Sequence, residues 1–461
     1  MQTENVTSET SDAANSSVSV PPNSGERNKE RAYRCPAYRE LTVTQELNIV
    51  GAFPALTVLP DDPEKRRQLK DRFDILHGEM TRYFVCMDRL NAAAGQGREA
   101  ELVALRQYFA ERTFRMTDDP VEIAADRENL HRSISAAHAL VSKLVDSYFS
   151  RRKQQTLKMS SPISSEHDPI NLLRMCRRNG RTDLQSRIDA FEARRALSLA
   201  EIEFKRHRKG IAKEQLEAVY NECCAHLKRD FFLPERSRRM VLIGDLDEQG
   251  IRVVGKPQLL PNDHPEAQAH ATARRQKIEL DIQFIRVPDK DGGTREIPVF
   301  FDGRVKDDVI PKLMLKGTKY PETLTDLIGV MLVFFSEEDE SDGVAHLRRT
   351  FANTLGSVSG STSRVGREGA MDSQNMDSSP LFYCDKYILE FFGSKVEIMF
   401  KPAIGYMNEI VARDEENHSL YKVRRYMNHV FPLMFPFEIY GIDWRDKDVR
   451  EDLWDLQIAM I

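Results

Sequence analysis

The stretch that decides the fold is residues 302–335, which read DGRVKDDVIPKLMLKGTKYPETLTDLIGVMLVFF. A strand-like run, residues 297–301, comes directly before it. The stretch ends in residues 330–335, a run apolar enough for a strand that is buried on both faces. Between these two runs, residues 307–316 are long enough for about two to three helical turns. We therefore expect a strand, a short helix and a buried strand, in this order.

The cationic side chains of this stretch are spaced so that they can meet on one carboxylate. Arg304 and Lys306 are two residues apart and can project from one side of an extended chain. Lys312 and Lys316 are four apart and share a helix face, and Asp326 lies at the mouth of the buried strand. A basic turn beside a strand is usually a solvated face. Cations that converge on a carboxylate also suit a triphosphate and its Mg²⁺, because the cations neutralise phosphate and the carboxylate binds the metal.

In order and spacing, the stretch resembles the synthetase-domain signature of the RelA/SpoT family. The matching residues are Arg304-Val305-Lys306, Lys312, Lys316-Gly317 and Asp326-Leu327-Ile328-Gly329. The resemblance extends over residues 278–431, about a third of the chain. It implies a nucleotidyltransferase-like mixed sheet with helices packed on it.

Four further positions match motifs of that family. Glu397, in Val-Glu-Ile-Met-Phe, resembles the glutamate of the family's Val-Glu-Ile-Gln strand. His418 and Lys422 resemble a His-x-x-Tyr-Lys motif, and they share one face of a long helix that we expect over residues 403–430. Tyr383 aligns with a tyrosine that stacks on the acceptor base in the family. By themselves, a glutamate on a strand and a polar helix stripe are more often surface features.

The resemblance implies transfer of the β,γ-pyrophosphoryl group of ATP to the 3′-hydroxyl of an acceptor, which is GDP or GTP in most members. Arg304 would face the adenine, and Lys306 and Lys312 would neutralise the triphosphate. Asp326 and Glu397 would hold Mg²⁺, and an ionised glutamate beside a ribose hydroxyl is a plausible general base. Catalysis would then be mostly alignment and charge neutralisation.

The sequence departs from the family pattern at two places. Met331 stands where the family has an arginine that closes the adenine site, and Asp385 and Tyr387 replace a serine and a histidine of the acceptor motif. These changes leave open another acceptor, such as an adenine nucleotide or transfer RNA. They also leave open a non-enzymatic protein that binds a nucleotide or a protein partner. Nucleic-acid binding has weaker support, because the basic runs 151–153 and 236–239 contain no interleaved aromatic residues.

Composition limits the class of protein. A chain of 461 residues is long for one domain, so two or three are expected. A net charge of −5 gives no overall field for a polyanion, which would need a local basic patch. The six cysteines are scattered without metal-ligand spacing, as in proteins of a reducing compartment. Because there is no apolar run of membrane-spanning length and no signal-peptide pattern, we expect a cytoplasmic protein without a membrane partner.

We expect an α+β protein in which a helical N-terminal region precedes the mixed-sheet domain. Residues 1–32 contain almost no large apolar groups, which predicts a disordered tail. Apolar residues three or four apart predict a helical bundle over residues 33–158 and a helical linker or subdomain over residues 159–235. Residues 236–435 would form the nucleotidyltransferase-like domain, and residues 436–461 a last packed helix.

Overall fold

The computed structural model describes most of the chain from residue 119 onward. It covers residues 63, 64, 67, 119–176, 184–209, 211–233, 236–269, 272, 274–289, 291–306, 308–316, 321–354, 384–414 and 416–461. The expected tail over residues 1–32, Tyr383 and most of the region 33–118 lie outside the described residues. No helix within the described ranges is long and apolar enough to cross a membrane.

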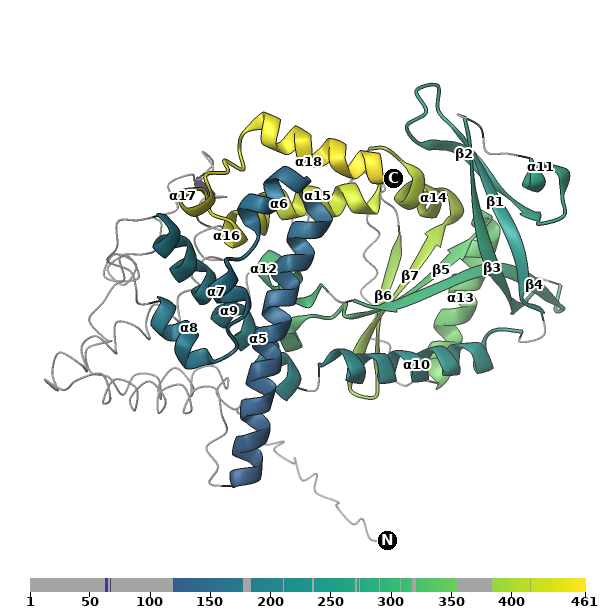
Figure 1. Cartoon of the computed structure of the whole chain (residues 1–461). Coiled ribbons are helices and arrows are strands. Elements are labelled where there is room, and N and C mark those ends of the chain that lie inside the picture. The colour runs from purple at the N-terminus through teal and green to yellow at the C-terminus, as the bar shows by residue number, and fades with distance from the viewer. Residues whose placement is uncertain are drawn as a thin grey trace, which may run out of the picture.

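A mixed sheet of seven strands is the centre of the α+β fold (Figure 1). Its strand order is β2-β1-β3-β4-β5-β7-β6, and every neighbouring pair is antiparallel except β5 and β7, which are parallel. The strands are β1 (Arg238–Leu246), β2 (Val253–Pro261), β3 (Arg275–Pro288), β4 (Thr294–Val305), β5 (Ile328–Phe334), β6 (Asp385–Phe391) and β7 (Ser394–Pro402). The mixed sheet and the buried strand predicted from the sequence are both observed.

Helices cover both faces of the sheet and continue into a helical region beside it (Figure 1). They are α5 (Pro120–Tyr148), α6 (Arg151–Leu157), α7 (Ser161–Ser164), α8 (Pro169–Cys176), α9 (Leu184–Arg208), α10 (Lys213–Asp230), α11 (Pro265–Gln268), α12 (Val309–Lys316), α13 (Glu337–Thr354), α14 (Ala403–Val411), α15 (His418–His429), α16 (Phe431–Met434), α17 (Phe437–Tyr440) and α18 (Lys447–Met460), with a 3-10 turn at Pro321–Thr323.

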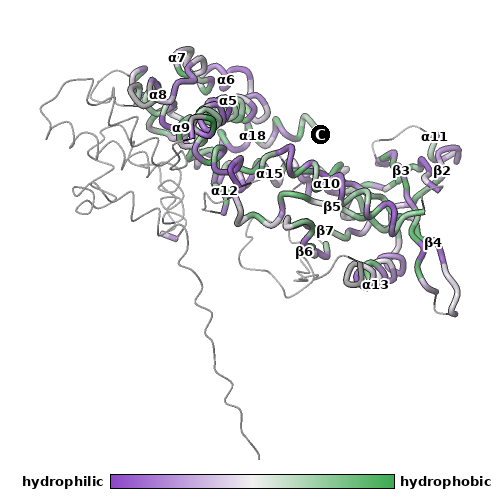
Figure 2. The backbone as a smooth tube through the Cα atoms, turned by 90° about the horizontal axis from the view of Figure 1, so that it is seen from below, coloured by the Kyte–Doolittle hydropathy of each residue, from purple (hydrophilic) through white to green (hydrophobic). Residues whose placement is uncertain are grey.

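Strand β5 divides its side chains between two hydrophobic clusters. All seven of its residues are buried, and its tube is mostly hydrophobic in colour (Figure 2). Val330 and Leu332 join a large cluster that includes residues of α10 and α13, whereas Met331 and Val333 join a second cluster with α14. This alternation follows from the two-residue period of a strand. It means that α10 and α13 cover one face of the sheet and α14 covers the other.

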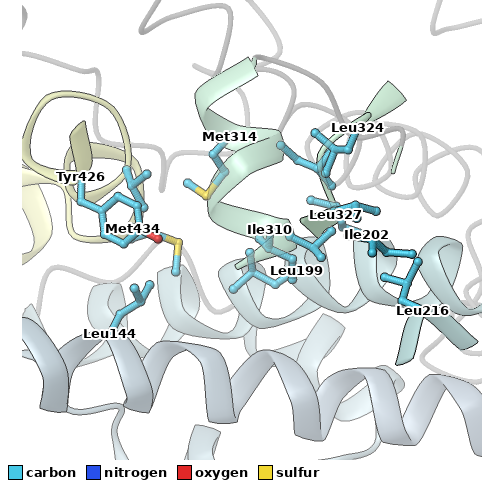
Figure 3. Close-up of a cluster of buried hydrophobic side chains, with 14 of the residues drawn as sticks. Leu144, Leu199, Ile202, Leu216, Ile310, Met314, Leu324, Leu327, Tyr426 and Met434 are labelled. Carbon is cyan, nitrogen blue, oxygen red and sulfur yellow. The ribbon is translucent and has the colours of Figure 1, made fainter. Parts of the chain in front are cut away.

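The large cluster also joins the sheet to the helical region. Figure 3 shows Leu144 of α5, Leu199 of α9, Ile310 of α12 and Tyr426 of α15 in one buried group. The apolar side of helix α12 packs in this group, so its position depends on α9 and α15. The short helix predicted over residues 307–316 is therefore observed, and its apolar side faces the helical region.

The single long helix expected over residues 403–430 is wrong. The structure has α14 and α15 there, separated by a turn. Asn417 is the N-cap of α15, and its side-chain oxygen accepts hydrogen bonds from the backbone N–H groups of Ser419 and Leu420. Asp414 caps the turn in the same way, since its carboxylate accepts from the Glu416 N–H. These local bonds compete with helix continuation.

A packing test of the sheet uses Gly343 of α13. A Cβ at this position would lie 2.3 Å from Cε1 of the buried Phe334 ring. Replacing a helical glycine by alanine normally stabilises a helix by about 1 kcal/mol. Here we expect Gly343→Ala to lower the free energy of unfolding by about 1–3 kcal/mol, because the ring has to shift. Urea denaturation measures this change.

Gly293→Ala is the matched control, because a Cβ there meets no atom within 4 Å. Its unfolding midpoint should stay close to that of the wild type. A Gly343→Ala protein more stable than the wild type would refute the packing of α13 on β5.

Candidate functional site

The register of three neighbouring strands builds the base of the site. Arg304 of β4 is paired with Gly329 of β5, and Gly329 is paired with Glu397 of β7. These residues share the sheet face that α14 covers, because their neighbours on the opposite face belong to the large cluster. Asp326 lies just before β5, and the backbone N–H of Lys306 donates to the Leu327 carbonyl at 2.8 Å. The ends of β4 and β5 are thereby held together.

Lys306 connects the two carboxylates that the sequence singled out. Its Nζ donates to Asp326 Oδ2 at 3.3 Å and to Glu397 Oε2 at 3.1 Å. The three side chains are largely buried, with exposed fractions of 14% for Lys306, 22% for Asp326 and 8% for Glu397. A buried charge is stable only when it is paired, so this lysine and these acids depend on one another.

Helix α12 brings two more lysines to Asp326. Lys312 Nζ donates to Asp326 Oδ2 at 2.8 Å and to the Asp326 carbonyl at 3.2 Å. Lys316, one turn further along, lies 4.0 Å from Asp326 Oδ1. The spacing of four residues therefore has the predicted effect, because both ammonium groups face the same carboxylate.

Lys386 also contacts the site, although the sequence analysis did not select it. Its Nζ donates to Glu397 Oε1 at 3.3 Å. Alternation along β6 puts Lys386 on the face of Glu397, whereas Tyr387 points to the large cluster on the other face. There Tyr387 packs on Phe400 and under the Arg348 guanidinium. Strict alternation through Asp385-Lys386-Tyr387 was the signal that could have identified this lysine.

The neighbouring charges and burial together shift the pKa values of the two carboxylates and of one lysine. Burial opposes the ionisation of Asp326, but Lys306 and Lys312 outweigh it and keep the pKa of that carboxyl far below its usual range. Burial also works against Glu397, whose pKa is nevertheless lowered by Lys306 and Lys386. Burial together with the charge of Lys306 lowers the pKa of Lys312 to about 8. Both carboxylates are therefore ionised at neutral pH, and Lys312 loses its proton at a lower pH than an ordinary lysine does.

A second group of polar side chains fixes Arg304. Its Nη2 lies 3.5 Å from Nε2 of His418, and Nδ1 of His418 lies 3.4 Å from Oε1 of Glu409. Burial lowers the pKa of His418 to about 4, aided by Lys422 and Arg304 and opposed by Glu409. The ring is therefore neutral. Because a guanidinium can only donate, Nε2 accepts from Arg304 and the Nδ1–H points to Glu409. Glu409 is also paired with the buried Lys401.

A pocket of about 450 Å³ lies beside these groups. Arg304, Lys306 and His418 line it, together with Met331, which stands where the RelA/SpoT pattern has an arginine. Lys422 is not part of the lining, and its Nζ lies 3.4 Å from Asp308 Oδ2 at the start of α12. Tyr383, which was predicted to stack on the acceptor base, lies outside the described residues.

Carboxylates such as Asp326 and Glu397 are the kind of ligand that binds Mg²⁺ together with substrate phosphates. Asp326 Oδ1 is buried and accepts no hydrogen bond, and the Lys316 ammonium lies 4.0 Å from it. Among the described residues, no group of three or more His, Cys, Asp or Glu side chains could enclose a metal. Mg²⁺ is commonly bound by one or two carboxylates plus substrate phosphates, and two carboxylates suffice for that.

Comparisons with known proteins found no match to the chain among protein-family models, curated proteins or solved structures.

The lowered pKa of Lys312 predicts a pH dependence of anion binding. As pH rises through about 8, Lys312 loses its proton, and a polyphosphate then meets one positive charge fewer. We expect the affinity for inorganic tripolyphosphate, measured by calorimetry, to be lower at about pH 9 than at about pH 7. Lys312→Arg stays charged over this range and should reduce that decrease. The same decrease in both proteins would contradict the assignment.

Proposed function

We propose that this protein is a Mg²⁺-dependent nucleotide pyrophosphokinase of RelA/SpoT type with a nucleotidyltransferase-like sheet. It would transfer the β,γ-pyrophosphoryl group of ATP to the 3′-hydroxyl of an acceptor nucleotide such as GDP or GTP. The hydroxyl oxygen would bond to the β-phosphorus, the bond from that phosphorus to the α,β-bridging oxygen would break, AMP would leave, and the hydroxyl proton would be released. One observation carries the proposal: Lys306, which lines the pocket together with Arg304, shares its ammonium between Asp326 and Glu397, two carboxylates that are not part of the lining themselves. Cations for a polyphosphate and carboxylates for a metal thus lie within the reach of one side chain.

The balance of charge supports polyphosphate binding. Four lysines contact the two carboxylates, so the site has an excess of positive charge; these are Lys306, Lys312, Lys316 and Lys386. Lysine ammonium groups bind phosphate as point charges and can exchange a carboxylate partner for a phosphate oxygen. Phosphoryl transfer is accelerated mainly by positioning and charge stabilisation, and this arrangement provides both.

Asp326 and Glu397 are the residues that would hold Mg²⁺. The bound ion would neutralise charge on the phosphate oxygens as the reaction proceeds. Glu397 is also the candidate acceptor for the proton of the attacking hydroxyl. Its lowered pKa keeps it ionised but makes it a weak base. Alignment and charge neutralisation would therefore contribute more than proton abstraction.

The acceptor is proposed from resemblance, and Lys386 modifies that proposal. Asp385 and Tyr387 point to the opposite face of the sheet, so the side chain that β6 presents on the site's face is Lys386, with its ammonium group. A further phosphate of the acceptor is a suitable partner for that ammonium. GDP or GTP fits this requirement, and so does an adenine nucleotide or the 3′-terminal nucleotide of a transfer RNA with its phosphodiester.

We expect the protein, incubated with labelled ATP and Mg²⁺, to pyrophosphorylate at least one acceptor among GDP, GTP, ADP, AMP and transfer RNA. Asp326→Asn and Glu397→Gln should each lower turnover by about 10²-fold or more, because a charge that supports the transition state is lost. Product chromatography measures the rate.

Glu390→Gln serves as the matched control, since Glu390 is exposed on the same hairpin and pairs in register with Lys395. Its turnover should equal that of the wild type. A folded wild-type protein that modifies none of the acceptors would refute the enzymatic proposal.

A second candidate function is nucleotide binding without chemistry. It is favoured by the occupation of both Glu397 oxygens, Oε1 by Lys386 and Oε2 by Lys306. A glutamate held in this way is poorly placed to accept a proton. Calorimetry separates the two functions: ATP binding that survives Glu397→Gln, with no product from any acceptor, would identify a diverged nucleotide-binding protein.

A further inference from the structure

One wall of the pocket comes from α18, an element that no motif indicated. Met460 and Ile461 at the end of this helix line the same pocket as Arg304 and Lys306. They are 59% and 41% exposed, and Ile410 of α14, also in the lining, is 41% exposed. We call these three side chains, Ile410, Met460 and Ile461, the apolar rim. Large apolar side chains that gather in one exposed patch indicate a binding surface.

The lining of the pocket combines apolar and charged side chains. Met331, Met399 and Tyr406 line it from the sheet and from α14. Lys306, also in the lining, contacts Asp326 and Glu397, and the acids Asp302 and Glu409 line the pocket as well. A ligand with a flat, largely apolar ring and a polyanionic tail can contact both the apolar side chains and the cations. A bare polyphosphate would use only the cations.

Helix α18 is fixed in place by its other side. Leu453 and Gln457 are buried, and the Gln457 amide donates to the Ser147 carbonyl of α5 at 3.3 Å. Arg450 donates to the Asn428 side chain of α15 at 3.0 Å. Figure 1 shows the end of α18 next to α14 and α15. The rim is therefore part of a packed framework, and its side chains reach the pocket without any rearrangement.

We propose that the end of α18 forms the apolar wall against which the ring of the bound nucleotide packs, and that this wall gives the site its preference for a nucleotide over a bare polyphosphate. The inference rests on the proposed function, because it takes the ligand to be a nucleoside polyphosphate. It assigns to Met460 and Ile461 a role in ligand selection and no part in the chemistry.

The test is a calorimetric titration of the full chain, in Mg²⁺, with a non-hydrolysable ATP analogue and with inorganic tripolyphosphate. In the wild type the analogue should bind more tightly than tripolyphosphate. The double variant Met460→Ser/Ile461→Ser should bind the analogue about tenfold more weakly, a loss typical of a ring contact, and tripolyphosphate equally well. Val254→Ser is the matched control, because Val254 is 45% exposed on the edge strand β2 and is not in the pocket lining.

The outcomes separate the two proposals. If the wild type binds neither ligand, the proposed function fails and the wall fails with it. If the wild type binds both ligands with equal affinity, the proposed phosphate site stands and the wall is wrong. The same holds if the double variant loses affinity for both ligands equally, or for neither. Because both substituted side chains are largely exposed, the double variant should keep the thermal stability of the wild type.

Discussion

The contact of one ammonium group, that of Lys306, with two carboxylates is the interaction on which the rest of the site depends. Removing three charged side chains from water costs several kcal/mol for each ion, and only close pairing offsets this cost. Asp326 precedes β5 and Glu397 lies on β7, so the pairing also requires these two strands to be neighbours. The same charges keep both acids ionised against the effect of burial. Strand order, charge state and site geometry are therefore set together.

Two glycines lie beside this contact, and they differ in how closely other groups approach them. A Cβ at Gly329 would lie 3.4 Å from Cε of Lys306, an ordinary van der Waals distance, so only a side chain longer than alanine would press on the lysine that joins the acids. A Cβ at Gly303 would lie 2.8 Å from the Tyr220 ring of α10, whose hydroxyl donates to the Gly303 carbonyl at 2.8 Å. The absence of a side chain at Gly303 thus lets α10 approach the strand that carries Arg304. Close approach explains Gly303 without any unusual backbone conformation.

The sequence predicted the parts of the site that depend on short-range periodicity. The buried run before Phe335 and the four-residue spacing of Lys312 and Lys316 are local patterns, and both were interpreted correctly. It did not predict the break between α14 and α15, because side-chain caps there outweigh helix propensity. Lys386 and the end of α18 were also missed. Their place in the site follows from strand pairing and helix packing between segments far apart in the chain, and no local pattern encodes such contacts.

The position of α12 explains why a helical region and a sheet share one core. Ile310, Leu313 and Met314 of α12 are buried among side chains that include Leu199 of α9 (Figure 3). The sheet fixes the carboxylates, whereas α9 fixes the helix that brings Lys312 and Lys316 to them. Neither part would bring these lysines and carboxylates together by itself. A shift of α12 by a fraction of a helical turn would separate Lys312 and Lys316 from Asp326, so the charge balance of the site depends on how α12 packs against α9 and α15.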